Sequence, residues 1–131
     1  MSVTRLNRPA RASTLIFSLL LLSGCGFLGD TKSINAATDL AIDCSTDEAL
    51  AALDKAEEGG GLSKYLAALE WVGILRDAGR DGEANEALAA YKALPEAASS
   101  SDEEIERSLD EFIEGLREER RERTGSPTCP G

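Results

Sequence analysis

The sequence predicts an all-α protein, a small antiparallel bundle of about four helices. Three observations support this fold class. Apolar residues recur at spacings of three and four through most of the chain beyond residue 45, which is the period of an amphipathic helix. No segment shows the alternation of apolar and polar residues that a half-buried strand requires. Start and stop signals divide the region into segments of helix length with short connections, which favour antiparallel neighbours.

The first predicted helix begins at Ser45, which has the spacing of a capping box with Glu48. It ends at the three glycines 59–61, because glycine tolerates the left-handed backbone that often closes a helix. The second helix runs from about residue 63 to residue 78. It is the most apolar of the four, so we expect it to be the central and most buried element.

The third helix begins near Asp81 and stops before Pro95, which cannot continue a helix. One face carries its apolar residues, Ala84, Ala87, Leu88, Tyr91 and Leu94. The fourth begins at Ser101, again with a glutamate three residues later, and its apolar stripe ends at Leu116. Residues 117–123 are all charged, so we expect these last turns to project into solvent.

The N-terminal 25 residues have the three parts of a bacterial secretory signal. Three arginines precede an apolar run at residues 15–22, which is too short to span a bilayer. The run ends in Leu22-Ser23-Gly24-Cys25, and this segment resembles the signal of bacterial lipoproteins at all four positions of their lipobox. The resemblance implies cleavage after Gly24, a diacylglycerol thioether on Cys25 and an acylated new amino terminus. An ordinary secretory signal with a chance cysteine is the alternative.

By the same resemblance, Gly26 after the lipidated residue is compatible with the outer membrane, with the protein facing the periplasm. We therefore expect a signal peptide at 1–24, a tether at 25–43 and a helical domain at 44–129. The tether is expected because Gly, Asp, Asn, Thr and Ser are scattered through it and its helical pattern is weak.

Charge and cysteine content narrow the possible partners. The chain without residues 1–24 has 11 basic and 24 acidic residues, a composition that argues against nucleic acid and against polybasic docking on lipid. Membrane attachment must then come from the acyl chains, which suffice for stable anchoring when there are two or more.

Cys44 and Cys129 bracket the helical region and are expected to form a disulfide in an oxidising compartment, two free thiols being the alternative.

The two middle helices resemble one tetratricopeptide unit at the centre of the bundle. The resemblance covers about 30 residues and rests on Gly73, Gly79, Ala84, Tyr91 and Pro95, which fill places comparable to the small, turn, alanine, aromatic and proline positions of that repeat. There is no second copy. The resemblance implies binding of a peptide or protein and no catalysis. A generic helical hairpin with the same turn chemistry is the alternative.

Catalytic chemistry has little support in the sequence. The chain has no histidine, which removes Ser-His-Asp and Cys-His catalysis and the usual zinc sites, so we expect no enzyme, no metal and no cofactor. Its many carboxylates leave a carboxylate-dependent hydrolase as a distant possibility. Acidic residues gather at helix starts and on the fourth helix, where capping and solvation account for them.

The leading functional hypothesis is a non-enzymatic lipoprotein adaptor that binds another cell-envelope protein, in the manner of pilotin-like assembly factors. The alternative is a small acidic inhibitor or immunity-type lipoprotein that neutralises a cationic protein. The partner site is expected as a groove beside the second and third helices, with Tyr65, Trp71 and Tyr91 as candidate anchors. Of these, Trp71 is expected to be mainly a core residue and Tyr91 to be the better surface candidate.

Overall fold

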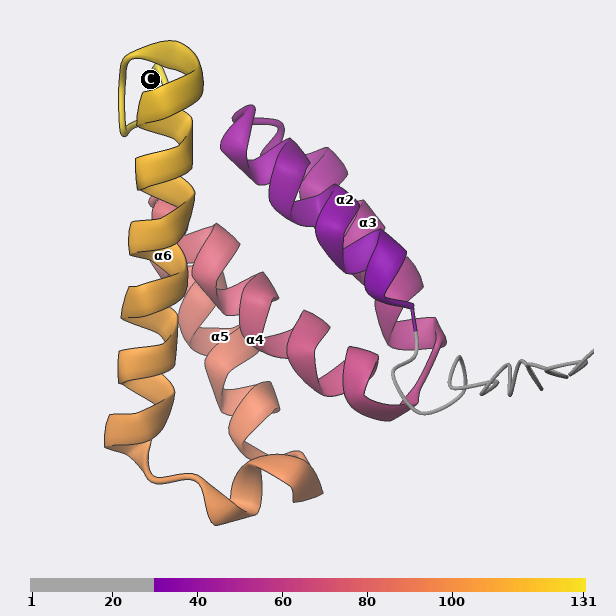
Figure 1. Cartoon of the computed structure of the whole chain (residues 1–131). Helices are drawn as coiled ribbons and strands as arrows, with labels where there is room; N and C mark the ends of the chain where they lie inside the picture. Colours follow the sequence, from indigo (N-terminus) through magenta and orange to yellow (C-terminus); the bar gives the residue numbers. More distant parts are fainter. Residues whose placement is uncertain (1–29) are drawn as a thin grey trace, which may run out of the picture.

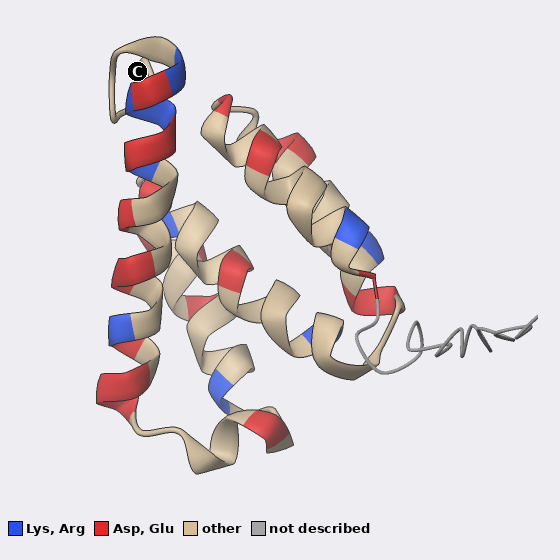
Figure 2. Ribbon diagram, in the orientation of Figure 1, with Lys and Arg blue, Asp and Glu red and all other residues tan. Residues whose placement is uncertain are grey.

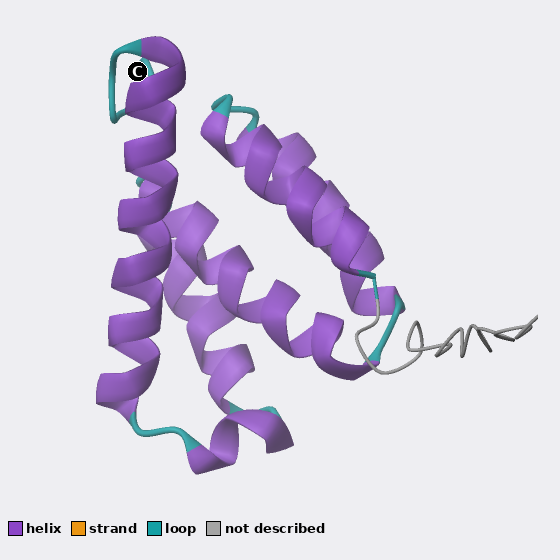
Figure 3. Ribbon diagram, viewed as in Figure 1, coloured by secondary structure: helices purple, strands orange, loops and turns teal. Residues whose placement is uncertain are grey.

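The computed structural model describes residues 30–131, which contain five α-helices, one short 3₁₀ helix and no strand (Figures 1 and 3). The all-α class is thereby confirmed. In chain order the elements are α2 (Thr31–Ile42), α3 (Thr46–Glu58), α4 (Gly61–Asp77), α5 (Asp81–Lys92), η1 (Pro95–Ser99) and α6 (Asp102–Thr124). The four predicted helices correspond to α3, α4, α5 and α6, so α2 and the short η1 are additional.

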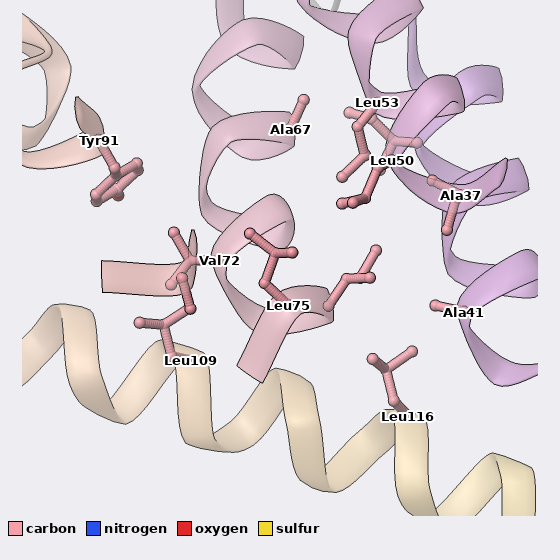
Figure 4. Close-up of a cluster of buried hydrophobic side chains, with 14 of the residues drawn as sticks. Ala37, Ala41, Leu50, Leu53, Ala67, Val72, Leu75, Tyr91, Leu109 and Leu116 are labelled. Carbon is pink, nitrogen blue, oxygen red and sulfur yellow. The ribbon is translucent and has the colours of Figure 1, made fainter. Parts of the chain in front are cut away.

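Helix α4 is the centre of the domain, as its composition predicted. It packs against α2, α3, α5 and α6, and four consecutive residues, Val72 to Leu75, are buried, which requires neighbours on every side. Figure 4 shows Leu75 of α4 in the same cluster as Leu53 of α3 and Leu116 of α6. The core is therefore a single cluster in which α4 contacts both the α2–α3 hairpin and α6, and α2 also packs directly against α6.

Gly73 of α4 permits the close approach of α6. A Cβ atom at this position would lie 2.4 Å from Cδ1 of Phe112, well inside van der Waals contact. The small residue that the tetratricopeptide resemblance singled out therefore accommodates an aromatic ring from α6. Gly79 has φ of +73° and ends α4, and the Arg80 N–H donates to the Leu75 carbonyl across that turn.

The predicted tether is wrong over residues 31–42, which form α2. Asp30 caps this helix by accepting a hydrogen bond from the Ser33 N–H at 3.1 Å. Its inner face buries Ile34, Ala37, Ala41 and Ile42, and α2 packs along α3 in an antiparallel pair (Figure 1). Two of these residues are alanines, whose small side chains let the helices approach, so packing stabilises a helix whose own sequence signal is weak.

The two predicted capping boxes have different outcomes. Ser101 and Glu104 form theirs in full at the start of α6. Ser45 makes no side-chain capping bond at the start of α3, so that prediction is wrong. The Ser45 N–H, which Glu48 would have to bind, already donates to the Leu40 carbonyl at 2.8 Å and closes the end of α2.

The last turns of α6 pack against the domain, contrary to the expectation that they project into solvent. Arg120 is only 1% exposed and donates to the carbonyls of Ala41, Ile42 and Pro127. Its guanidinium also forms a 2.6 Å ion pair with Asp77 at the end of α4. The predicted Cys44–Cys129 disulfide is present beside this cluster, with the two Cα atoms 5.6 Å apart. The start of α3 and the end of α6 thus meet at one end of the molecule.

Candidate binding groove

A groove runs across α3, α4 and α5 and has a volume of about 300 Å³. Ala68, Ala87, Ala90 and Leu94 supply its apolar surface together with two aromatic rings, Trp71 and Tyr91. The alanine side chains are small and leave the groove open, because larger side chains at these positions on α4 and α5 would fill the space between the helices. The groove lies beside the α4–α5 hairpin, where the sequence placed the partner site.

Trp71 and Tyr91 both line the groove but differ in exposure. Trp71 is partly buried, so one part of its indole packs on the core and another part faces the groove. Tyr91 is 2% exposed, and its expected role as the better surface candidate is therefore wrong. Its burial follows from its position one helical turn after Ala87 on the inner face of α5, where α4 covers it.

Tyr65 lies outside the groove. Its ring packs against that of Tyr91, with the ring centres 5.0 Å apart, so Tyr65 contacts a groove residue without lining the groove itself. It also lines a separate hollow together with Leu62 of α4 and Glu96 of η1. The structure thus brings two of the three candidate aromatic residues into the groove, and the third packs against one of them.

Charged side chains border the groove on the α3 side. Asp54 and Glu57 are one helical turn apart, and Lys64 of α4 lies on the same border. Partial burial and the neighbouring Asp54 carboxylate both raise the pKa of Glu57 above its ordinary value, while Lys64 acts in the opposite direction. Among residues 30–131, Glu57 has no ion-pair partner within 4 Å, so the groove offers an unmatched anionic group.

A second perturbed carboxylate, Glu70, lies outside the groove and faces α2. Its one hydrogen-bond partner in the described chain is the Thr38 hydroxyl, at 3.4 Å. Burial raises the pKa of Glu70 to about 7, and the bond from Thr38 lowers it only in part. The sequence carries a signal for this residue, an acid in the middle of the apolar run Ala67-Ala68-Leu69-Glu70-Trp71-Val72.

Cys25 and the rest of the lipobox lie outside the described residues. Within residues 30–131, no helix is long and apolar enough to cross a membrane. The same part of the chain contains no cluster of three or more cysteine and carboxylate side chains placed to hold a metal ion.

Comparison with known proteins identified no relative of this chain. No protein-family model matches the chain, and neither the curated proteins nor the solved structures contain a match.

Proposed function

We propose that the chain is a lipid-anchored, periplasm-facing adaptor that binds a segment of another cell-envelope protein in the α3–α4–α5 groove. The observation that carries the proposal is the combination of an apolar floor, a partly exposed indole and an unmatched carboxylate in one groove. Such a surface suits a peptide segment with an apolar face and a lysine or arginine beside it.

Charge complementarity supports a cationic occupant. Asp54 and Glu57 oppose a single lysine at the groove border, and the chain as a whole is strongly acidic. A partner cation beside Glu57 would relieve the repulsion from Asp54 and gain a charge-assisted contact in a partly desolvated place. The aromatic face of Trp71 in the same groove offers a further favourable contact for an arginine.

Photo-cross-linking from the groove, combined with charge reversal at Glu57 or at the neighbouring Glu58, tests this proposal. A photo-cross-linking amino acid replaces Ala90 inside the groove, or Ala51 on the outer face of α3 as a positional control. We expect a discrete cross-linked envelope protein from position 90 and not from position 51. In the position-90 protein, Glu57→Lys should abolish that product, whereas Glu58→Lys, one residue away and outside the groove, should preserve it.

Two outcomes would contradict the adaptor proposal. One is equal cross-linking from positions 51 and 90. The other is equal loss of the product with Glu57→Lys and Glu58→Lys, because both variants change the net charge by the same amount and only Glu57 lines the groove.

The inhibitor alternative has its own supporting surface on α6. Acidic side chains that are exposed and form no ion pair within the described chain follow this helix, namely Glu103, Glu104, Asp110, Glu111, Glu114, Glu118 and Glu122 (Figure 2). Binding of a cationic protein there would weaken steeply with salt. It would also be insensitive to Glu57→Lys, which separates the two proposals.

The anchor has a direct test of its own. Cys25→Ser should abolish incorporation of labelled fatty acid and leave the precursor unprocessed. Mass spectrometry of the Cys25 peptide and membrane fractionation provide the readouts, and equal labelling of variant and wild type would exclude lipidation at this residue.

A further inference from the structure

The end of the domain at which α2 begins has three neighbouring parts. Asp30, the capping residue of α2, touches the α3–α4 turn, since a Cβ atom on Gly59 would lie 3.2 Å from the Asp30 Cβ. Helix α4 starts at the same turn, and its first residues therefore lie at this end too (Figure 1). We call the surface formed by residues 30–32, 55–62 and 64–65 the N-terminal end surface.

This surface carries an unusual apolar side chain. Leu62, in the first turn of α4, is 40% exposed and is the one large hydrophobic residue in the described chain that is classed as exposed. Tyr65 lies one turn further along α4 and lines the same shallow hollow as Leu62. An apolar residue with a tyrosine beside it is the combination that membrane interfaces favour, because both the apolar body and the polar tip of tyrosine find suitable surroundings there.

The lysines are distributed unevenly as well. Three of the four in the chain, Lys32, Lys55 and Lys64, lie on this surface, on α2, α3 and α4. None of the three has an ion-pair partner within 4 Å among residues 30–131, whereas Lys92 pairs with Asp102. Figure 2 shows basic segments of α2 and α3 side by side near this end.

The length of the intervening chain limits how far this surface lies from the anchor. Four residues, 26–29, lie between Cys25 and Asp30, and the five Cα-to-Cα steps from Cys25 to Asp30 span at most about 18 Å at full extension. The 18 residues that follow Cys25 in the tether expected from the sequence, 26–43, would have a root-mean-square span of about 23 Å if flexible and a far longer maximum reach. Because α2 removes twelve of those residues from the linker, the domain is held close to the bilayer by its N-terminal end.

We infer that the N-terminal end surface rests on the bilayer, with Leu62 in the interfacial layer and the three lysines among the lipid phosphates. This inference depends on the proposed lipidation of Cys25. The acyl chains provide the attachment, and the surface sets the orientation of the domain. Asp30, Glu57 and Glu58 belong to the same surface, so it is not a polybasic patch that would bind lipid by itself.

The orientation has a consequence for the groove. Helix α4 runs away from the bilayer, so Lys64 and Glu57 border the groove near the lipid and Trp71 lies further out. The disulfide and the C-terminus are then at the outer end. A partner segment would enter the groove from beside the membrane, as expected for a segment close to a membrane anchor of its own.

Single-tryptophan variants of the full lipoprotein test the orientation. Trp71 is the chain's one tryptophan, so Trp71→Phe provides a silent background. Leu62→Trp in this background reports on the N-terminal end surface, and Glu118→Trp, exposed on the last turns of α6, is the matched control. Both proteins are reconstituted in vesicles of phosphatidylglycerol and phosphatidylethanolamine with a fraction of brominated lipid, which quenches a nearby indole.

The expected result is a blue-shifted emission from the Leu62→Trp protein that brominated lipid quenches strongly, with neither effect in the Glu118→Trp protein. Replacing Lys32, Lys55 and Lys64 together by glutamine should reduce the quenching of the indole at position 62 while the protein stays on the vesicles. Equal emission and equal quenching at the two positions, in protein whose Cys25 lipid is verified by mass spectrometry and which floats with the vesicles, would overturn the orientation alone. Absence of the lipid on Cys25 would overturn the anchor and the orientation together.

Discussion

The two ends of the domain are built in opposite ways. At the end that holds the C-terminus, a disulfide joins Cys44 to Cys129, and a buried arginine connects α6 to α4 and to the carbonyls that end α2. At the other end, Asp30 and Gly59 bring α2 and the α3–α4 turn into van der Waals contact. The three lysines of that end have no ion-pair partner in the described chain.

This difference indicates where the fold is stabilised and where it remains available for outside contacts. The C-terminal end satisfies its charges internally, with Asp77 bound by both Arg117 and Arg120. Among the described residues, the N-terminal end presents three lysines without an ion-pair partner and an exposed leucine, and these side chains are available for contacts with a surface outside the domain. Three stability measurements test this division.

The largest effect is expected from removal of the disulfide. A bridge with a sequence separation of 85 residues restricts the unfolded chain and stabilises the domain by about 4.5 kcal/mol in the chain-entropy account. Reduction of the purified domain, or replacement of both cysteines by alanine, should shift the denaturant midpoint accordingly. Equal midpoints for the oxidised and reduced protein would show that the C-terminal end does not depend on the covalent link.

Arg120→Ala should destabilise the domain nearly as much, by about 4 kcal/mol, because it leaves the Asp77 carboxylate without its buried partner and removes the guanidinium hydrogen bonds to the carbonyls of Ala41, Ile42 and Pro127. The neighbouring Arg121 is exposed and forms no ion pair in residues 30–131, so Arg121→Ala is the matched control, with a change within about 0.5 kcal/mol. Similar chemical denaturation curves for the two variants would contradict the assigned role of Arg120.

Arg120 also shows how far sequence reasoning reaches. The apolar stripe of α6 includes Ile105, Leu109, Phe112 and Leu116, and the same helical spacing continues to residue 120. Periodicity alone would place Arg120 on the buried face of α6. Because arginine is charged, however, it was expected to face solvent, and its buried partner could not be identified from the sequence. That partner, Asp77, is 43 residues away and is brought near only by the packing of α6 on α4.

The other predictions from the sequence were right where structure depends on neighbouring residues and wrong where it depends on contacts between distant segments. Helices α4, α5 and α6 were predicted well because glycine, proline and a capping box mark their ends locally. Helix α2 was missed because its stability comes from the face it buries on α3. A groove lies beside α4 and α5, and its use as a partner site stays a prediction. The burial of Tyr91 was missed because it depends on how closely α4 covers α5, and the apolar pattern of a single helix does not contain that information.

The smallest effect, and the one that depends on pH, concerns Glu70, whose contact with Thr38 lies midway along α2 between the two ends. Burial raises the pKa of Glu70 from its ordinary 4.5 to about 7 in the folded protein, so the charged form is disfavoured there. Stability should therefore fall as pH rises through the window between these values, with a loss of up to about 3 kcal/mol complete above pH 7.

Glu70→Gln keeps a hydrogen-bond acceptor for Thr38 and carries no charge at any pH, so it should match the wild type near pH 4.5 and be up to about 3 kcal/mol more stable at pH 8. Glu86→Gln, on the exposed face of α5, is the control and should parallel the wild type throughout. Denaturant unfolding at half-unit pH intervals measures the difference between variant and wild type, in which the titration of the other carboxylates cancels. A constant offset between Glu70→Gln and the wild type from pH 4.5 to 8 would mean that Glu70 ionises freely in the folded protein. Water would then reach the contact between Glu70 of α4 and Thr38 of α2, in contrast to the buried environment of Arg120. The buried, internally paired region would in that case be limited to the C-terminal end of the domain and would not extend to the middle of α2.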